Sequence, residues 1–516
     1  MSPSPPPPPV DPPFLPVPVL RLTTRQYNRT LADLFPGLRL PALELPLEVS
    51  VGGFLNNARA QAPTPDLIER LASNANQVAL LAVASPSAVL PCAPTSAAEE
   101  TPCGHAFIDD FAPRALRRPL SSTTSASLYQ LFDEAHLSYG FAAAVRMVIE
   151  ALLISPELLY LLEEGEPTPG ALRSLSAFEL ASRLSYFLWD TMPDQALFES
   201  ARRGTLLTDP RELTAQAERM LLDPKAKEAV ARFHEQWLRL DKLAGIDKDR
   251  RLFPSWNEDL AAALKDETIR YVDRLFWSAD LPTLLTDSHG FVSDASAAIY
   301  GAPPPQSASP VWTALDPAQR SGLLTQPGLM AAFAHETADA PILRGVFVRD
   351  RLLCLNNGSP PPNAPVDPPP PSGNAVTTRQ RIELLHAAQP NCIGCHEGID
   401  GVGFTFGHYD AIGAWRTMDS GQPVDARGTL SGSGAATDGP VRDALELSRK
   451  LAASRVVSDC VADQWTRYAL GLDRSEINAP MVRPIRQAFA DSGLDFRKLL
   501  VAIVTSEAFR LRVRTP

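Results

Sequence analysis

The sequence predicts a mainly α-helical protein built from several consecutive domains. Its 516 residues are about three times the length of a typical domain of roughly 150 residues. Apolar residues recur at helical spacing along most of the chain, and Val424–Leu430 is the most plausible short strand. The chain holds 50 prolines, about twice the usual share of roughly 5%, and their clusters separate the helical segments.

The expected helices show both start signals and apolar periodicity. A Ser or Thr is followed three residues later by Gln or Glu at Thr23–Gln26, Ser176–Glu179 and Thr377–Gln380. This spacing is typical of a capping box, in which each side chain satisfies a free backbone N–H of the other residue. We expect helices over Leu22–Phe35, Ala142–Leu162, Ala229–Leu240, Leu260–Phe276, Val441–Ala453, Val456–Leu470 and Phe496–Phe509. Aromatic residues at helical spacing, such as Phe233, Trp237 and Phe276, are best explained as core.

Composition excludes several function classes. Hydrophobic residues make up 45% and charged residues 21%, as in ordinary globular proteins. The net charge of -11 argues against nucleic acid as a partner. No stretch supplies the roughly 20 apolar residues of a membrane helix, because Gln77–Val89 is short and interrupted by Pro86. We therefore expect no transmembrane segment.

Six segments follow from these boundaries. Residues 1–20 form a proline-rich tail, which favours extended polyproline II and shows no signal peptide. The remaining segments are a helical domain over 21–90, a second over 91–167, a central one over 172–302, a domain over 318–431 with a proline-rich linker at 359–371, and a C-terminal helical domain over 438–512.

A cysteine motif indicates the chemistry of the 318–431 domain. Cys392, Cys395 and His396 match the C-x-x-C-H pattern by which c-type haem is attached. Thiols one helical turn apart can add to the two vinyl groups of one porphyrin, and the adjoining histidine then binds the iron. We predict covalent haem c with His396 as its proximal iron ligand. Zinc would need four ligands and a thioredoxin-like dithiol a βαβ context, and neither pattern is present.

The other four cysteines suit two bridges, Cys92–Cys103 and Cys354–Cys460, with buried free thiols as the alternative. Covalent haem c and disulfides both form outside the cytoplasm. The sequence therefore predicts an extracytoplasmic protein in the periplasm or at the cell surface, although no signal peptide is visible. A start codon assigned at the wrong position, or a removed leader ahead of the tail, would reconcile the two observations.

The second axial ligand of the iron decides between electron transfer and small-molecule chemistry. His408 is the favoured candidate, because it follows His396 by 12 residues and the intervening glycines can let the chain fold back over the porphyrin. The alternatives are an open position, His335, His386, Met330 and Met418. His335 does not begin a metalloprotease motif, because Asp339 replaces the second histidine.

Three further interpretations concern individual side chains. Trp415 and Arg416 can pack on a porphyrin edge and pair with a propionate, or form a core tryptophan beside a solvated arginine. Acid pairs such as Glu163–Glu164 are interpreted as solvated faces. His234 has no partner at ligand spacing and is interpreted as structural.

Motifs along nearly the whole chain resemble one protein family. They are Arg21–Asn28 with Gly53–Asn57, Cys103–Pro119 with Ile154–Pro156, Leu180–Trp189, Arg344–Gly345 with Gly403–Phe404 and Asp410–Arg416, and Trp465–Gly471 with Ser506–Phe509. They are similar to bacterial extracytoplasmic multi-domain proteins of unknown function, of planctomycete and myxobacterial type, that carry a single cytochrome-c-like haem motif. The resemblance implies a secreted or surface haem protein with no established substrate. Family members often read His-x-x-Met-Asp-Pro, where this chain has Ile399, Asp400 and Gly401, a change that affects loop packing and leaves the thioether sites intact.

The function that these observations predict is that of an extracytoplasmic monohaem c-type cytochrome-like protein, serving electron transfer or a redox-enzyme system. The alternative is a cell-envelope or polysaccharide-binding scaffold in which the haem is auxiliary. The sequence identifies no redox partner and leaves open whether the protein is itself an enzyme.

Overall fold

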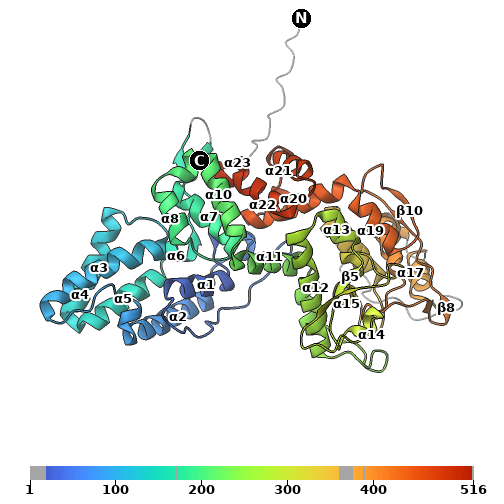
Figure 1. Ribbon diagram of the computed structural model, residues 1–516, viewed down its shortest axis with the longest axis horizontal. Helices are drawn as coiled ribbons and strands as arrows, with labels where there is room; N and C mark the ends of the chain where they lie inside the picture. The colour runs from blue at the N-terminus through green and yellow to red at the C-terminus, as the bar shows by residue number, and fades with distance from the viewer. Residues whose placement is uncertain (1–18, 169–171, 359–375, 388–389, 514–516) are drawn as a thin grey trace, which may run out of the picture. The chain divides into compact units, whose positions relative to one another are not determined.

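The computed structural model describes residues 19–168, 172–358, 376–387 and 390–513, and this part of the chain is mainly helical. The chain forms two compact units (Figure 1). Unit 1 comprises Met1–Ala229, Thr466–Pro484 and Ile503–Pro516, and unit 2 comprises Val230–Trp465 and Ile485–Ala502. Both units are therefore assembled from segments far apart in the sequence.

Unit 1 is built from helices that share an apolar core. Its first helices are α1 (Thr24–Leu34), α2 (Pro65–Ala84), α3 (Ala97–Leu116), α4 (Ser122–Tyr139), α5 (Phe141–Leu153) and α6 (Pro156–Leu159). The next are α7 (Ala177–Trp189), α8 (Gln195–Arg202), α9 (Thr205–Thr208), α10 (Pro210–Leu221) and the first part of α11 (Pro224–Trp237). Fully buried rings such as Tyr27, Phe107 and Phe111 fill the core.

Short strands close unit 1 at its chain ends. Strand β1 (Leu20–Arg21) pairs with β2 (Tyr160–Leu161). Strand β4 (Leu172–Ser174) pairs with β3 (Glu166–Pro167) on one side and with the C-terminal strand β11 (Leu511–Val513) on the other. The last described residues therefore return to the unit that contains the first.

A buried acid in unit 1 corrects one interpretation of the sequence. The side chain of Glu163 is only 7% exposed and accepts hydrogen bonds from Arg183 Nε at 2.6 Å and Arg512 Nε at 3.1 Å. Both arginines are also buried, so the carboxylate neutralises charge that water does not reach. The interpretation of Glu163 as part of a solvated face is wrong, whereas its neighbour Glu164 is exposed.

Unit 2 contains the segment with the cysteine motif. Its first helices are α12 (Glu258–Ser278), α13 (Leu281–Thr286), α14 (Ala297–Tyr300), α15 (Pro327–Ala332) and α16 (Pro341–Phe347), which a π-helical turn η5 (Val348–Leu352) extends. They are followed by α17 (Thr378–Ala387), α18 (Pro390–Gly403), the 3-10 turn η6 (Phe404–Phe406) directly after α18, and α19 (Ala444–Ala452). Antiparallel strand pairs are β5 (His289–Val292) with β6 (Val311–Ala314), β7 (Met418–Asp419) with β8 (Gln422–Pro423), and β9 (Gly428–Leu430) with β10 (Gly439–Val441). The chain passes between the units within α11, α20 (Arg455–Leu470), α21 (Ala479–Asp491) and α22 (Phe496–Thr505), and α23 (Glu507–Arg510) precedes β11.

Aromatic side chains form part of the core of unit 2, as their helical spacing predicts. Phe233 stacks on Trp465 with 3.6 Å between ring centroids, and the rings of Trp237 and Phe276 lie within 6 Å of the buried His234 ring. Aromatic pairs of this kind add to the free energy gained from burying their area.

Local signals in the sequence are confirmed at all three capping boxes. Thr23 with Gln26, Ser176 with Glu179, and Thr377 with Gln380 each form both expected hydrogen bonds. The helix expected over Ala142–Leu162 is instead two helices, because Pro156 has no N–H and starts α6 behind the cap Ser155. Ser506 similarly caps a new helix and ends the one expected to continue to Phe509. The strand expected over Val424–Leu430 is limited to β9.

Both predicted disulfides are present, Cys92–Cys103 and Cys354–Cys460. Among the described residues, no helix combines the length and hydropathy needed to span a bilayer.

Candidate functional site

The cysteine motif lies on helix α18. Positions 392, 395 and 396 have i, i+3 and i+4 spacing in this helix, which places them on one face within about one turn. The side chains of Cys392 and Cys395 lie outside the described part of the structure. The helical backbone nevertheless gives these three positions the proximity that attachment of one porphyrin requires.

His396 is oriented by a carboxylate on the same helix. Its Nδ1–H donates to Oδ1 of Asp400 at 3.1 Å, one helical turn further along. The two side chains are 25% and 13% exposed, so water competes only partly for this hydrogen bond. With the proton held at Nδ1, Nε2 is the nitrogen that can bind a metal ion.

Helix α18 is packed closely along its second half and is open near the motif. A Cβ on Gly345 of α16 would lie 2.2 Å from the carbonyl oxygen of Ile399, and a Cβ on Gly403 would lie 2.1 Å from that of Pro341. Only glycine therefore permits this helix crossing. By contrast, a Cβ on Gly394, between the two cysteines, would meet no described atom within 4 Å. The C-terminal half of α18 is therefore held firmly, whereas the described residues place no atom against position 394.

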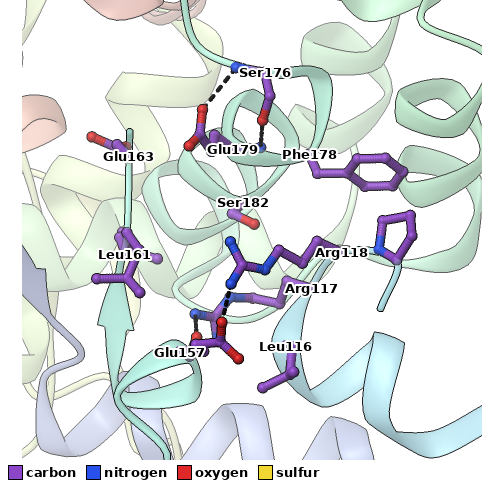
Figure 2. Close-up of a pocket in the computed structure, with 12 residues that line it drawn as sticks. Leu116, Arg117, Arg118, Glu157, Leu161, Glu163, Ser176, Phe178, Glu179 and Ser182 are labelled. Carbon is purple, nitrogen blue, oxygen red and sulfur yellow. Dashed lines mark hydrogen bonds and ion pairs between the residues drawn. The ribbon is translucent and has the colours of Figure 1, made fainter. Parts of the chain in front are cut away.

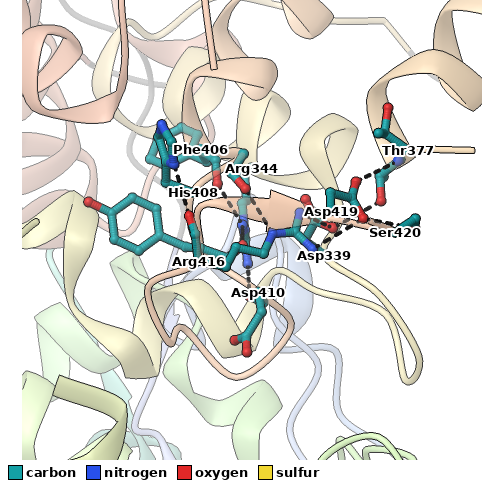
Figure 3. Close-up of polar contacts among 12 residues, drawn as sticks. Asp339, Arg344, Thr377, Phe406, His408, Asp410, Arg416, Asp419 and Ser420 are labelled. Carbon is teal, nitrogen blue, oxygen red and sulfur yellow. Dashed lines mark hydrogen bonds and ion pairs between the residues drawn. The ribbon is translucent and has the colours of Figure 1, made fainter. Parts of the chain in front are cut away.

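A buried arginine holds the segment that follows α18. The guanidinium of Arg344 is 1% exposed and donates to the carbonyl oxygens of Phe406, Tyr409 and Asp410 at 3.3, 2.7 and 2.7 Å (Figure 3). Burial lowers the pKa of Arg344 to about 10, so the side chain remains charged at neutral pH. Arg320, also buried, donates to the carbonyl of Gly413 at 2.9 Å. Two cations thus fix the backbone between η6 and β7 through its carbonyls.

His408 lies on this clamped segment. Its Nδ1–H donates to the carbonyl oxygen of Arg416 at 2.9 Å, and the N–H of Arg416 donates back to the carbonyl of His408 at 2.7 Å. The ring stacks on Trp415 with 4.5 Å between centroids. Trp415 therefore packs on an imidazole of its own chain, and Nε2 of His408 is the nitrogen that Nδ1–H donation leaves as an acceptor.

One helical run separates His408 from His396. Gly403 has right-handed helical dihedral angles, and η6 follows α18 directly. At about 1.5 Å per residue in an α-helix and about 2 Å in a 3-10 helix, the run from His396 to Phe406 advances by roughly 15 Å. His408 therefore lies on the segment beyond the end of this run, outside α18, and its ligation of the same iron as His396 stays a prediction.

Arg416 is paired within the protein and is not a solvated side chain. Its guanidinium contacts Asp339 at 2.9 Å and donates through Nε to the carbonyl of Gly407 at 2.9 Å (Figure 3). Asp339 is 1% exposed and also accepts the hydroxyl of Thr378 at 3.2 Å. These groups border a cavity of about 180 Å³ that Arg379 and Phe404 also line. Pairing of Arg416 with a propionate would therefore compete with an existing buried ion pair.

The other candidate ligands have different environments. Met330 is buried, its carbonyl accepting from Arg344, whereas Met418 is 49% exposed on β7. The carbonyl of His335 accepts from the buried Lys248 at 2.9 Å. The side chain of His386 lies outside the described part. Within that part, no group of three or more His, Cys, Asp and Glu side chains is arranged to hold a metal ion.

A cavity of about 210 Å³ in unit 1 has walls whose charged groups bind one another (Figure 2). Arg117 donates to the carbonyls of Leu158, Glu157 and Tyr160, and Arg118 pairs with the Glu157 carboxylate. Glu179 belongs to the cap of α7. These contacts hold the fold together.

The sequence does not point directly to two features of the site. Asp400 belongs to the family motif, and its spacing of four residues from His396 on a helix is a usable signal of their contact. The clamp of Arg344 and Arg320 had no such signal, because its acceptors are backbone carbonyls that any residue provides.

Comparison with known families assigns most of the chain. Five family models, each described as a protein of unknown function, match in succession: DUF1587 over residues 21–84, DUF1595 over 103–163, DUF1592 over 175–302, DUF1588 over 320–419 and DUF1585 over 438–509. The DUF1588 match contains the cysteine motif and His408. No curated protein and no solved structure matches the chain. The chain is therefore a multi-domain protein assembled from five families of unknown function.

Proposed function

We propose that the protein is an extracytoplasmic monohaem c-type cytochrome-like protein that transfers electrons or serves a redox-enzyme system. The observation that carries the proposal is the placement of Cys392, Cys395 and His396 within one turn of α18, with Nδ1 of His396 already engaged by Asp400. A covalently bound haem would supply one-electron chemistry at its iron.

The described residues fit such a group. The imidazole of His396 offers Nε2, the nitrogen by which histidine binds metals when Nδ1 donates a hydrogen bond. An added Cβ on Gly394 would meet no described atom within 4 Å, and the second half of α18 packs closely against α16. In this arrangement the two thiols would anchor the porphyrin, and His396 would hold its iron from one side.

The disulfides support the proposed compartment. The bridges Cys92–Cys103 and Cys354–Cys460 fit an oxidising, extracytoplasmic location. Export of the chain would also bring it to the compartment in which haem c is attached, so the location and the cofactor support each other.

The second axial position decides the kind of redox role. His408, whose Nδ1–H is engaged by the carbonyl of Arg416, is the proposed second ligand, and a position open to an external ligand is the alternative. Low-spin six-coordinate spectra that His408→Ala converts to high-spin spectra would support the first case, whereas carbon monoxide or cyanide binding by the unaltered protein would support the second.

The test is expression with a periplasmic leader and the haem-maturation machinery, followed by intact mass and an absorption spectrum. We expect one added haem mass that survives denaturation and is lost in Cys392→Ala/Cys395→Ala. The double variant Cys92→Ala/Cys103→Ala removes the same number of thiols elsewhere and should keep the haem. Exported protein that is colourless and has only the mass of its polypeptide would contradict the proposal.

A further inference from the structure

The hydrogen bond between His396 and Asp400 has a consequence for the proposed cofactor. Asp400 is a carboxylate that accepts from Nδ1 of the imidazole, and a histidine that donates through Nδ1 binds metals through Nε2. A histidine ligand that donates instead to a backbone carbonyl has a neutral acceptor. The acceptor here can carry a full negative charge, which binds the Nδ1 proton more strongly.

The surrounding helix fixes this pair. The spacing of four residues places both side chains on one face of α18. Ile399, adjacent to Asp400, is buried, and its backbone carbonyl contacts Gly345 of α16. Because both residues lie on one continuous helix that packs closely against α16, Asp400 stays one turn from His396, and both side chains are largely shielded from water.

We propose, on the basis of the haem function proposed above, that Asp400 is a positioning residue that sets the orientation and the donor strength of His396. By attracting the Nδ1 proton, the carboxylate increases electron density on the imidazole and makes Nε2 a stronger donor. A stronger donor stabilises ferric iron more than ferrous iron, because the ferric ion carries the higher charge. Asp400 thereby lowers the reduction potential of the bound haem.

The test compares two substitutions on the same helix that each remove one carboxylate charge. Asp400→Asn keeps the shape of the side chain and removes its charge, and Glu397→Gln does the same at an exposed position beside His396. Haem-loaded proteins are titrated electrochemically. We expect Asp400→Asn to weaken the preference for ferric iron at least tenfold, which equals about 59 mV for a one-electron couple. Glu397→Gln should shift the potential by less than half of that amount.

Asp400→Glu keeps the charge and covers the case in which Asp400→Asn does not fold. The reduction potential of Asp400→Glu should stay closer to that of the unaltered protein than to that of Asp400→Asn. Where Asp400→Asn cannot be purified, the shift of Asp400→Glu should be no larger than that of Glu397→Gln. Equal shifts in Asp400→Asn and Glu397→Gln would overturn the inference, since only a general charge effect would be present. A potential of Asp400→Glu closer to that of Asp400→Asn than to that of the unaltered protein would overturn it as well. Where Asp400→Asn cannot be purified, an Asp400→Glu shift larger than that of Glu397→Gln would do so. Absence of haem from the unaltered protein would instead overturn the proposed function, so the two failures are distinguishable.

Discussion

Acidification should destabilise unit 2 through one histidine in its aromatic core. His234 is 1% exposed, its Nδ1–H donates to the carbonyl of Val230 at 2.9 Å, and its Nε2 has no hydrogen-bond partner among the described residues. The rings of Trp237, Phe276 and Trp465 lie 5.4–5.9 Å from it. Burial lowers the pKa of His234 to about 3, from an ordinary value of 6.5.

The magnitude follows from proton linkage. Between pH 6.5 and about 3 the unfolded chain binds a proton that the folded chain excludes, so the free energy of unfolding falls as the pH falls through this range. At about 1.4 kcal/mol per pKa unit, the full contribution is about 5 kcal/mol. By about pH 4.5 the loss is roughly 3 kcal/mol, and above pH 6.5 the contribution is constant.

The assay compares the unaltered protein with His234→Leu, which has a similar volume and no titrating group. Urea unfolding of unit 2, followed by tryptophan fluorescence, is measured at about pH 7.5 and about pH 4.5. We expect the unaltered protein to lose roughly 3 kcal/mol more than the variant over this interval. His105→Leu, at a partly exposed histidine of unit 1, should keep the unaltered pH dependence of unit 2. Identical pH dependence of His234→Leu and the unaltered protein would refute the reasoning.

Two further substitutions test buried contacts. Glu163→Gln leaves two buried arginines without their carboxylate and should destabilise unit 1 by about 3–5 kcal/mol in urea unfolding. The control Glu164→Gln, at an exposed position, should have little effect. Equal effects of the two substitutions would contradict the role of the buried ion pairs. Gly345→Ala places a Cβ 2.2 Å from the carbonyl oxygen of Ile399 and should lower the melting temperature of unit 2 by several degrees. The Cβ of Gly394→Ala would meet no described atom within 4 Å, so this control should leave the melting temperature unchanged or raise it. A tolerated Gly345→Ala would show that α16 and α18 are not in close contact.

The sequence predicts what depends on neighbouring residues and misses what depends on distant ones. The capping boxes were identified because Thr23 and Gln26, or Ser176 and Glu179, satisfy each other across three residues. The burial of Glu163 is not evident from the sequence, because its arginine partners lie 20 and 349 residues away. Two adjacent acidic residues in a sequence are typical of an exposed surface. The burial of Glu163 becomes evident only when the fold places Arg183 and Arg512 beside it.

The same distinction applies to the candidate site. The spacing of Cys392, Cys395 and His396 is a local property, and the helical backbone of α18 agrees with it. The disulfide Cys354–Cys460 spans 106 residues and was still predicted, because few cysteines were left to pair. The clamp of Arg344 could not be predicted, since its acceptors are backbone carbonyls, three of them 62–66 residues away, and no residue type reveals them.

Glycines between His396 and His408 show why a residue type alone does not determine a backbone path. The sequence allowed them to fold the chain back, which favoured His408 as a second ligand. In the structure, Gly401 and Gly403 continue the helix and permit close approach, since their Cβ atoms would lie 2.7 Å from the carbonyl oxygen of Thr429 and 2.1 Å from that of Pro341. A glycine needed for close packing resists conversion into a turn, because the contact that requires it would be lost. These glycines therefore do not by themselves favour His408 as a second ligand, and the spin state of the loaded protein tests that ligation directly.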